Sequence, residues 1–322
     1  NSRVLIIDGL NLYLRTFAVN GMLNDRGVPI GGMMGFLKSL AYAIRETNPT
    51  RLIVTYDGAG GSQRRRKLHP NYKGNRKPGK RITRWDAFKN VEEEKQAMKI
   101  QFSRLLEYLD TLPINVISID RIEADDTIAY ITNNLLKDEV IIMSADQDFL
   151  QLVNKRVTVW SPIKKIFYTP EKVLEDYGVP AHNFLMYKIL MGDKSDNLEG
   201  VKGLGPKKLP KILPDISSNP LDLDFILDYA SKGTEPMHKR IVESIDQLTL
   251  NEKLMDLKNP PISGELKLQI TRLIEAPINL LSSNSFNTMY TDDQMGNAID
   301  IPDIWLKQHF TRLNSYAKAT HG

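Results

Sequence analysis

The sequence has 322 residues, of which 41% are hydrophobic and 25% are charged, values that are typical of a globular protein. It contains no cysteine, which excludes disulfides and thiolate zinc sites and favours a reducing compartment such as the cytoplasm. No apolar run approaches the roughly 18 residues that cross a bilayer, so no membrane partner is expected. The length predicts about two domains.

The first half of the chain alternates apolar runs with helical patterns. The apolar runs are rich in β-branched residues, and several are uninterrupted, as in parallel strands that are buried on both faces. Strands are predicted at residues 4–7, 52–56, 114–119, 140–143 and 157–160. Helices are predicted at residues 33–45, 92–109, 125–136 and 170–177, the last with Thr169 as its N-cap. This alternation predicts an α/β fold with a parallel sheet.

A basic window without any acidic residue runs from Gly58 to Trp85. Clustered positive charge favours a surface that binds a polyanion, although a solvated or disordered basic loop is an equally good interpretation. The window lies between the second predicted strand and the helix at residues 92–109, so we expect a partly helical, mobile excursion from the sheet. Its basic residues are Arg64, Arg65, Arg66, Lys67, Lys73, Arg76, Lys77, Lys80, Arg81 and Arg84.

Strand patterns are not found after about residue 178. The rest of the sequence is predicted to be helical, with loops at residues 219–220, 259–261 and 282–287. We therefore expect an α/β domain at residues 1–180 and a helical domain at residues 181–322.

Three of the predicted strands are followed by an aspartate, namely Asp8, Asp57 and Asp146. A single aspartate at such a position is usually a turn or cap residue. In an open parallel sheet, however, the carboxyl ends of the strands border the ligand-binding crevice. We therefore expect these three acids to meet in one crevice.

Further acids follow at close spacing, and together they predict a metal site. At about 4 Å, like charges repel by about 4 kcal/mol at an effective dielectric of 20, so such a cleft needs cations or protons. Ligands that are all oxygen favour magnesium or manganese over zinc. Phosphodiesters are hydrolysed with two such ions about 4 Å apart, and a nucleic-acid substrate also accounts for the basic window. The further acids are Glu123, Asp125, Asp126, Asp148, Asp193 and Asp196; Glu123 and Asp126 share an i, i+3 spacing with Asp193 and Asp196.

Several motifs occur in a fixed order along the chain. They are Asp8, YDG at residues 56–58, YKGNR at 72–76, EADD at 123–126, ADQD at 145–148 and GDKSDN at 192–197. In this order they resemble the flap endonuclease and 5′–3′ exonuclease family. The sequence is similar in particular to the bacteriophage 5′ nucleases and to the 5′-nuclease domain of bacterial DNA polymerase I, over residues 4–213. Ordered motifs are more specific than any one of them alone.

The resemblance implies a PIN-like α/β nuclease core with a helical arch at about residues 58–110. It also implies a C-terminal helical domain with a helix–three-turn–helix element, of the helix–hairpin–helix type, at about residues 198–213. Lys73 and Arg76 match a catalytic basic pair that stabilises charge on the scissile phosphate. Two ions, Mg²⁺ or Mn²⁺, would be held at a first site by Asp8, Asp57, Glu123, Asp125 and Asp146, with Asp126 in the same motif, and at a second site by Asp148, Asp193 and Asp196.

The segment VKGLGPKKL at residues 201–209 resembles the hairpin of that element. Gly203 and Gly205 would let backbone N–H groups approach a phosphate, and Pro206 would begin the next helix. Pro210 falls where the interior of that helix is expected, which predicts a bent or short helix. The family further implies a potassium ion bound by carbonyls of the hairpin. DNA contacts are implied for Tyr72, which would stack on an unpaired base, and for Arg64, Arg65, Gly203, Gly205, Lys207 and Lys208.

The resulting expectation is a divalent-metal-dependent 5′–3′ exonuclease and 5′-flap endonuclease that removes RNA primers in replication, with RNase H activity on RNA–DNA hybrids. Two alternatives stay open: a PIN-type ribonuclease and a DNA-junction-binding protein without catalysis. Leu10 stands where phosphatases of the haloacid dehalogenase type need a second acid, and no GxxxxGK[ST] run indicates ATP use. We expect a monomer of bacteriophage origin that acts in the cytoplasm of a bacterial host, with a single-strand-binding protein or a polymerase as partner.

Overall fold

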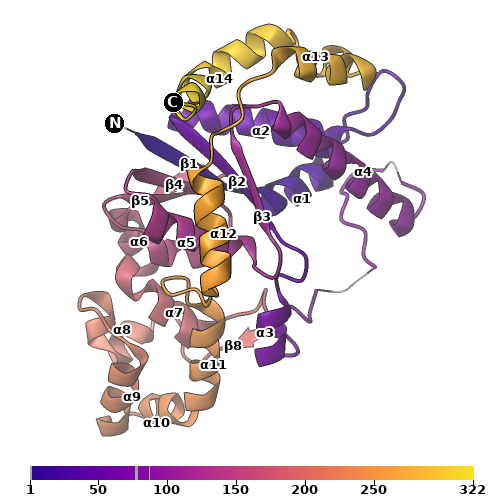
Figure 1. Ribbon diagram of the computed structural model, residues 1–322. Helices are drawn as coiled ribbons and strands as arrows, with labels where there is room; N and C mark the ends of the chain where they lie inside the picture. The colour runs from indigo at the N-terminus through magenta and orange to yellow at the C-terminus, as the bar shows by residue number, and fades with distance from the viewer. Residues whose placement is uncertain (1, 77–78, 87) are drawn as a thin grey trace.

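The computed structural model describes residues 2–76, 79–86 and 88–322, so Lys77 and Pro78 of the basic window lie outside the described residues. Its centre is a six-stranded sheet in the order β3–β2–β1–β4–β5–β6 (Figure 1). Neighbours among β1 to β5 are parallel, and β6 is antiparallel to β5. All the predicted strands are confirmed, whereas β6 is too short to give a periodic signal. The strands are β1 (Arg3–Asp8), β2 (Arg51–Asp57), β3 (Asn115–Ile119), β4 (Glu139–Met143), β5 (Val157–Ser161) and β6 (Ile166–Tyr168).

The predicted helices of the first half are also present. They are α2 (Gly31–Thr47), α4 (Val91–Asp110), α6 (Pro170–Tyr177), and α5 (Ala124–Tyr130) continued by a π-helical turn at Ile131–Leu135. The Thr169 side chain accepts a hydrogen bond from the Lys172 N–H, which confirms the predicted N-cap of α6. One further helix, α1 (Gly9–Val19), starts directly after Asp8 and buries Leu12 and Phe17. It therefore turns the chain sharply at the end of β1.

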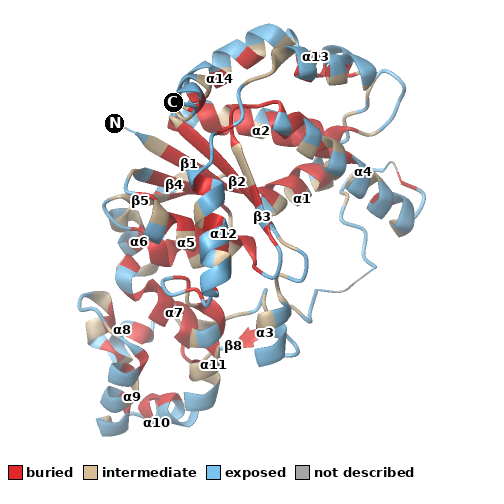
Figure 2. Cartoon of the chain, viewed as in Figure 1, coloured by how far each residue is buried: buried red, intermediate tan, exposed pale blue. Residues whose placement is uncertain are grey.

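Two hydrophobic cores lie on the two faces of the sheet. In β1, Val4 and Ile6 point into one core and Leu5 and Ile7 into the other, because side chains alternate along a strand. One core is covered by α5 and α6, and the other by α1, α2 and α4. Figure 2 shows the central strands β1, β2 and β4 as mostly buried between these layers, whereas the edge strand β3 is partly exposed. Burial on both faces explains why the strand sequences are uninterrupted apolar runs.

Beyond residue 178 the chain is mainly helical, with two corrections to the expectation. β7 (Gly192–Asp193) and β8 (Leu198–Glu199) form a short antiparallel ribbon where no strand was expected. The loop expected at residues 282–287 contains instead the start of a helix, because Phe286 is fully buried. The helices are α7 (Phe184–Met191), α8 (Leu209–Ile212), α9 (Leu223–Lys232), α10 (Pro236–Glu243), α11 (Ile245–Met255), α12 (Gly264–Glu275), α13 (Ser283–Asp292) and α14 (Pro302–Ala319), and single 3₁₀ turns lie at Ala181–Asn183, Pro214–Ser217 and Gly296–Ala298.

The last two helices return to the α/β core. Phe286 of α13 and Phe310 of α14 belong to the same hydrophobic core as α2. Helices α8 to α11 extend from α7 at the opposite end of the molecule (Figure 1). The helices that follow residue 181 thus pack in two different places, and the domain boundary at residue 180 stays a prediction.

The basic window contains the short helix α3 (Gln63–Leu68), and α4 follows the window in the chain. Its second half is held by specific contacts. The buried Glu94 carboxylate accepts hydrogen bonds from the N–H groups of Ile82 and Thr83. Phe88 stacks on Phe17 of α1 at a ring-centroid distance of 5.9 Å. These contacts tie Ile82 and Thr83 to α4 and Phe88 to α1. Among the described residues, no helix combines the length and apolar character needed to cross a membrane.

Candidate metal and nucleic-acid site

The aspartates at the strand ends line an acidic cavity of about 130 Å³. Asp8 ends β1 and Asp57 ends β2, and because these strands are parallel neighbours, both side chains lie at the same edge of the sheet. The Ala124 N–H, at the start of α5, donates to Asp57 Oδ1 at 2.7 Å, which places the acids of α5 beside the strand end. The carboxylates that line this cavity are Asp8, Asp57, Glu123, Asp125 and Asp146.

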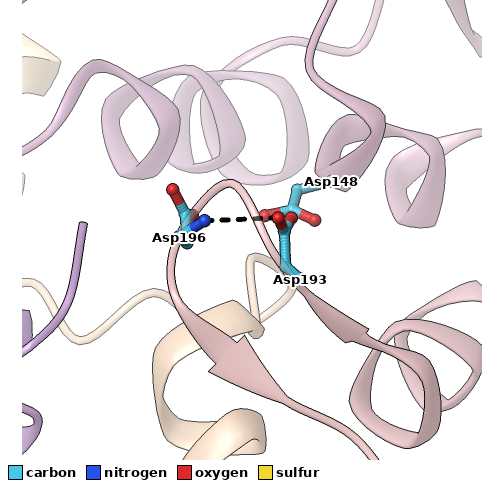
Figure 3. A group of neighbouring side chains, drawn as sticks. All are labelled: Asp148, Asp193 and Asp196. Carbon is cyan, nitrogen blue, oxygen red and sulfur yellow. Dashed lines mark hydrogen bonds between the residues drawn. The ribbon is translucent and has the colours of Figure 1, made fainter. Parts of the chain in front are cut away.

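A second carboxylate group is formed by Asp148, Asp193 and Asp196 (Figure 3). One oxygen from each residue lies within 4.8 Å of the other two. Asp148 comes from a 3₁₀ turn at Gln147–Leu152, whereas Asp193 and Asp196 come from β7 and the loop behind it. The N–H groups of Ser195 and Asp196 donate to Asp193 Oδ1 at 2.8 and 3.3 Å and fix this loop. Asp193 and Asp196 border a larger cavity of about 480 Å³.

Asp146 connects the two groups. It lines both cavities, as do Asn11, Lys73 and Arg76. Asp146 is the N-cap of the 3₁₀ turn, and its Oδ1 accepts from the Asp148 N–H at 2.9 Å. The two acidic groups therefore share a wall of both acidic and basic side chains.

Burial and crowding oppose the ionisation of these acids. Burial, followed by the charges of Asp146 and Asp57, raises the pKa of Asp8 to about 7. Burial and the charge of Asp146 also raise the pKa of Asp125 and that of Asp148. Bound cations or protons are therefore needed to stabilise the site at neutral pH.

The donor set fits hard divalent cations. The side chains that border the two cavities supply carboxylate oxygens, and no histidine lines either cavity among the described residues. Asp148 Oδ1 is buried and has no hydrogen-bond partner within the described part of the chain. Oxygen donors of this kind suit magnesium and manganese.

The pKa of Asp8 makes the stability of the metal-free protein dependent on pH. An acid whose pKa is raised on folding, here from 3.8 to about 7, favours the protonated folded state. The free energy of unfolding should therefore fall as pH rises from about 4 to 7, by an amount on the order of a few kcal/mol. Thermal unfolding in EDTA at pH 5 and pH 8 measures this, and Mg²⁺ should restore stability at pH 8 only.

The matched control for this prediction is Asp8→Asn, which cannot ionise and should reduce the pH dependence, while Asp125 and Asp148 keep part of it. A wild-type protein whose stability in EDTA does not fall between these pH values would contradict the prediction. So would a slope that Asp8→Asn leaves unchanged.

Lys73 and Arg76 tie the basic segment to both acidic groups. Lys73 Nζ donates to Glu123 Oε1 at 3.3 Å, and the Arg76 guanidinium donates to Asp196 Oδ1 at 3.1 Å. The Lys73 N–H donates to the Asp196 carbonyl at 3.0 Å, and Lys73 has a left-handed φ of 57°. Such a conformation is strained for a residue other than glycine. The lysine side chain lines both cavities.

The structure places Arg65 and Asp126 in contact with each other, and the predicted roles of Arg65 toward DNA and of Asp126 toward a metal stay predictions. Arg65 in α3 is only 3% exposed. Its guanidinium donates to both Asp126 oxygens at 2.6 and 2.8 Å, and to Glu123 Oε2 at 2.7 Å. Asp126 lines neither cavity. The shared helix face of Glu123 and Asp126 thus binds an arginine, which donates to both oxygens of Asp126.

The Tyr72 side chain belongs to the hydrophobic core on the α5 face and is 5% exposed. Its stacking on an unpaired base stays a prediction. Lys73 Nζ lies 4.9 Å from the ring centroid. Arg64 is partly buried and donates to the Lys253 carbonyl at 3.2 Å. Both residues hold the basic segment to the body of the protein.

Residues 201–208 form a turn before α8, in which Lys202, Gly203, Lys207 and Lys208 are exposed and Val201 and Leu204 are buried. Gly203 has a φ of 82°, which L side chains rarely adopt, and Lys208 Nζ donates to its carbonyl at 3.2 Å. Pro206 does not begin the helix, since α8 starts at Leu209. Pro210 is therefore in the first turn, where its missing N–H has no intrahelical partner to lose. The expected short helix is confirmed, because α8 has 4 residues.

Lys188 is a site residue that the sequence analysis missed. Its ammonium group contacts Asp193 at 2.8 Å and Asp148 at 3.6 Å. A signal was present, because Lys188 is the one charged residue in the apolar helix FLMYKILM. A lysine in such a helix is rarely buried without a partner.

The family comparison agrees with this geometry. The sequence model of the family described as 5′-3′ exonuclease, N-terminal resolvase-like domain, matches residues 3–178. The 5′-3′ exonuclease of Bacillus subtilis (strain 168) is 30% identical over 280 residues, which cover 83% of this chain and 87% of the relative. The chain belongs to the 5′–3′ exonuclease family, as the ordered motifs predicted.

Two further comparisons concern the extent and the fold of the chain. DNA polymerase I of Caldicellulosiruptor bescii is 28% identical over 95% of this chain, which spans only 36% of that relative. The flap endonuclease of bacteriophage T5, solved in complex with DNA and metal ions, has a TM-score of 0.64 at 21% identity, covering 90% of this chain and 97% of that one. The likeness to the T5 structure confirms the expected α/β nuclease fold.

Proposed function

We propose that the protein is a divalent-metal-dependent 5′–3′ exonuclease and 5′-flap endonuclease that hydrolyses phosphodiesters. Family membership supports the reaction class. The observation that carries the proposal for this chain is the pair of carboxylate groups that meet at Asp146, in cavities that Lys73 and Arg76 also line. This combination offers negative charge for metal ions and positive charge for a phosphate within the same site.

In this proposal the acids of the smaller cavity hold one ion, and Asp148, Asp193 and Asp196 hold the other. Two divalent ions, magnesium or manganese, supply activation of water and stabilisation of the leaving oxygen. Asp126 is assigned a structural role with Arg65, because Arg65 occupies both of its oxygens. In this assignment Arg65 and Lys73 orient the Glu123 carboxylate, because each donates to one of its two oxygens.

Lys73 and Arg76 are proposed to bind the scissile phosphate. Each now pairs with a carboxylate, Glu123 or Asp196. Arg76 has a side chain that is 61% exposed, so it can reach a substrate that enters from solvent. Positive groups fixed beside the reacting phosphate stabilise the charge that develops on it in the transition state.

The turn at residues 201–208 is proposed to bind the phosphates of duplex DNA beside the cut. Lys202, Lys207 and Lys208 are exposed there, and the left-handed backbone at Gly203 suits a close approach to a phosphate. A potassium ion bound by carbonyls of this turn stays a proposal. No base-reading element is needed, since phosphate contacts position the duplex without specifying sequence.

The two lysines of the turn should control the salt dependence of DNA binding. Lys207→Ala and Lys208→Ala should each weaken binding and lower the slope of log K against log salt by about 1. Fluorescence anisotropy with a labelled duplex at several salt concentrations measures the slope. Lys232→Ala, at the exposed end of α9, is the control and should leave the slope unchanged. A slope that both variants share with the wild type would contradict the role of the turn.

The cellular role is proposed from the same site. A phosphodiesterase that accepts 5′ ends would remove RNA primers from RNA–DNA hybrids during replication, in the cytoplasm of a bacterium or of the bacterial host of a phage. A polymerase or a single-strand-binding protein would be its partner, and the protein would act as a monomer.

Incubation with a 5′-flap DNA labelled at its 5′ end tests the proposed reaction. We expect cleavage near the flap junction with Mg²⁺ and none in EDTA. Matched flaps of RNA separate this activity from that of a PIN-type ribonuclease, which would cut the RNA flap alone. Binding of the flap without cleavage under both conditions would support the non-catalytic alternative and contradict the proposal.

A further inference from the structure

Lys188 is a buried cation beside the second carboxylate group. It lies on α7 among apolar neighbours, and its side chain is only 10% exposed. Its Nζ donates to Asp193 Oδ2 at 2.8 Å and lies 3.6 Å from Asp148 Oδ1. These two acids, with Asp196, are the group whose oxygens lie within 4.8 Å of one another. The ammonium group therefore contacts two of the three carboxylates that are proposed to hold the second ion.

Both oxygens of Asp193 are already in use. Oδ2 accepts from Lys188, and Oδ1 accepts from the Ser195 hydroxyl at 2.6 Å and from the Ser195 N–H at 2.8 Å. A metal ion that binds Asp193 through Oδ2 must therefore displace the ammonium group or share the carboxylate with it. In either case the positive charge of Lys188 opposes the charge of the ion.

The two carboxylate groups differ in how many of their acids contact a basic side chain. Two basic side chains, Arg65 and Lys73, form salt bridges with the first carboxylate group, and both do so at Glu123. Asp8, Asp125 and Asp146 have no salt bridge to a basic side chain in the described part of the chain. The first site thus keeps more uncompensated negative charge than the second, where Lys188 contacts two of three acids.

We infer that Lys188 is a positioning residue that holds Asp148 and Asp193 together without a metal and makes the second divalent ion bind more weakly than the first. The inference rests on the proposed function, because it presumes that both groups bind ions. Lys188 would act as an internal substitute for the second ion. The second site would then fill mainly when substrate phosphate adds negative charge, while the first fills without substrate.

A direct phosphate contact is a weaker explanation for Lys188. Lys188 lines the larger cavity, but its side chain is only 10% exposed and its ammonium group faces two carboxylates, whereas Lys73 and Arg76 line both cavities. An incoming phosphate would meet these two residues in either cavity.

Titration of the full chain with Mn²⁺, followed by the electron paramagnetic resonance signal of free Mn²⁺, tests the inference without any substrate. We expect two ions on the wild type, with the second weaker than the first. Lys188→Met should tighten the second ion by about tenfold or more and leave the first within about threefold, because one opposing charge a few ångströms away is removed. Lys188→Gln, which keeps a donor for Asp193 but no charge, should tighten it as well.

Two controls make the result specific. Lys188→Arg keeps the charge and should preserve the weak second site. Lys194→Met removes an exposed charge from the loop between β7 and β8, which also carries Asp196. It should change the affinity for the second ion by less than about threefold, because an exposed charge is screened by solvent. Circular dichroism identifies any variant that fails to fold, and Lys188→Gln then decides in place of Lys188→Met.

The outcomes separate the inference from the proposed function. Two ions on the wild type with an unchanged or weaker second affinity in Lys188→Met and Lys188→Gln would overturn the role of Lys188 alone. Fewer than two ions on both the wild type and the lysine variants would overturn the two-ion site itself.

Discussion

Asp146→Asn is expected to lower kcat by about 100-fold or more while DNA binding is kept, because loss of even an outer partner of a metal ligand costs about 10–100-fold. Asp146 is the carboxylate that lines both cavities, so its charge is available to both proposed ions. Asparagine keeps the size and the Oδ1 that accepts from the Asp148 N–H. The change therefore removes charge with little change of shape. Single-turnover cleavage of a 5′-flap substrate measures the loss.

Binding should behave differently from turnover in this variant. A carboxylate repels the phosphates of DNA, so its removal should leave affinity unchanged or increase it. The matched control is Asp110→Asn, at the exposed end of α4, which should cleave and bind like the wild type. A large loss of affinity with normal turnover on saturating substrate would contradict the role given to Asp146.

Arg65→Met is expected to lower the free energy of unfolding by about 3–5 kcal/mol, the usual cost of removing one partner from a buried ion pair. The guanidinium is buried and binds Glu123, Asp126 and the Leu254 carbonyl. Methionine has a similar volume but leaves Asp126 buried without a counter-charge. Urea denaturation in EDTA measures the change without a contribution from bound metal.

The next residue in the chain provides the control for Arg65. Arg66→Met makes the same substitution at an exposed position of α3 and should cost less than about 0.5 kcal/mol. Adding Asp126→Asn to Arg65→Met should recover part of the loss, since it removes the unpaired charge. Equal stabilities of Arg65→Met and Arg66→Met would show that the buried ion pair does not stabilise the fold.

The sequence predicts the position of a site residue wherever the topology of the strands determines it. Asp8 and Asp57 end parallel strands that are neighbours, so their convergence follows from the sheet alone. The uninterrupted apolar strands and the capped helix α6 depend on local chemistry and were predictable for that reason. The remaining acids of the site lie in loops and turns, where hydrophobic periodicity gives no position, and they were predicted from the ordered motifs.

Other side chains have surroundings that depend on contacts between distant segments. In the sequence, Arg65 is one of several consecutive basic residues that are expected at the surface. Burial of its guanidinium is favourable only because it pairs with Asp126, 61 residues away. Tyr72 lies in the basic segment, yet its ring packs into the core against which that segment folds. Lys188 meets Asp148 only because α7 packs beside the 3₁₀ turn. Such pairings are set by tertiary packing, which the local pattern of charges does not encode.

The most direct test of the account is an X-ray structure from crystals soaked in Mn²⁺, with data collected at the manganese absorption edge. The account predicts two anomalous peaks, one among Asp8, Asp125 and Asp146 and one among Asp148, Asp193 and Asp196. Crystals that hold these side chains in the same places but show no peak at either group would contradict it.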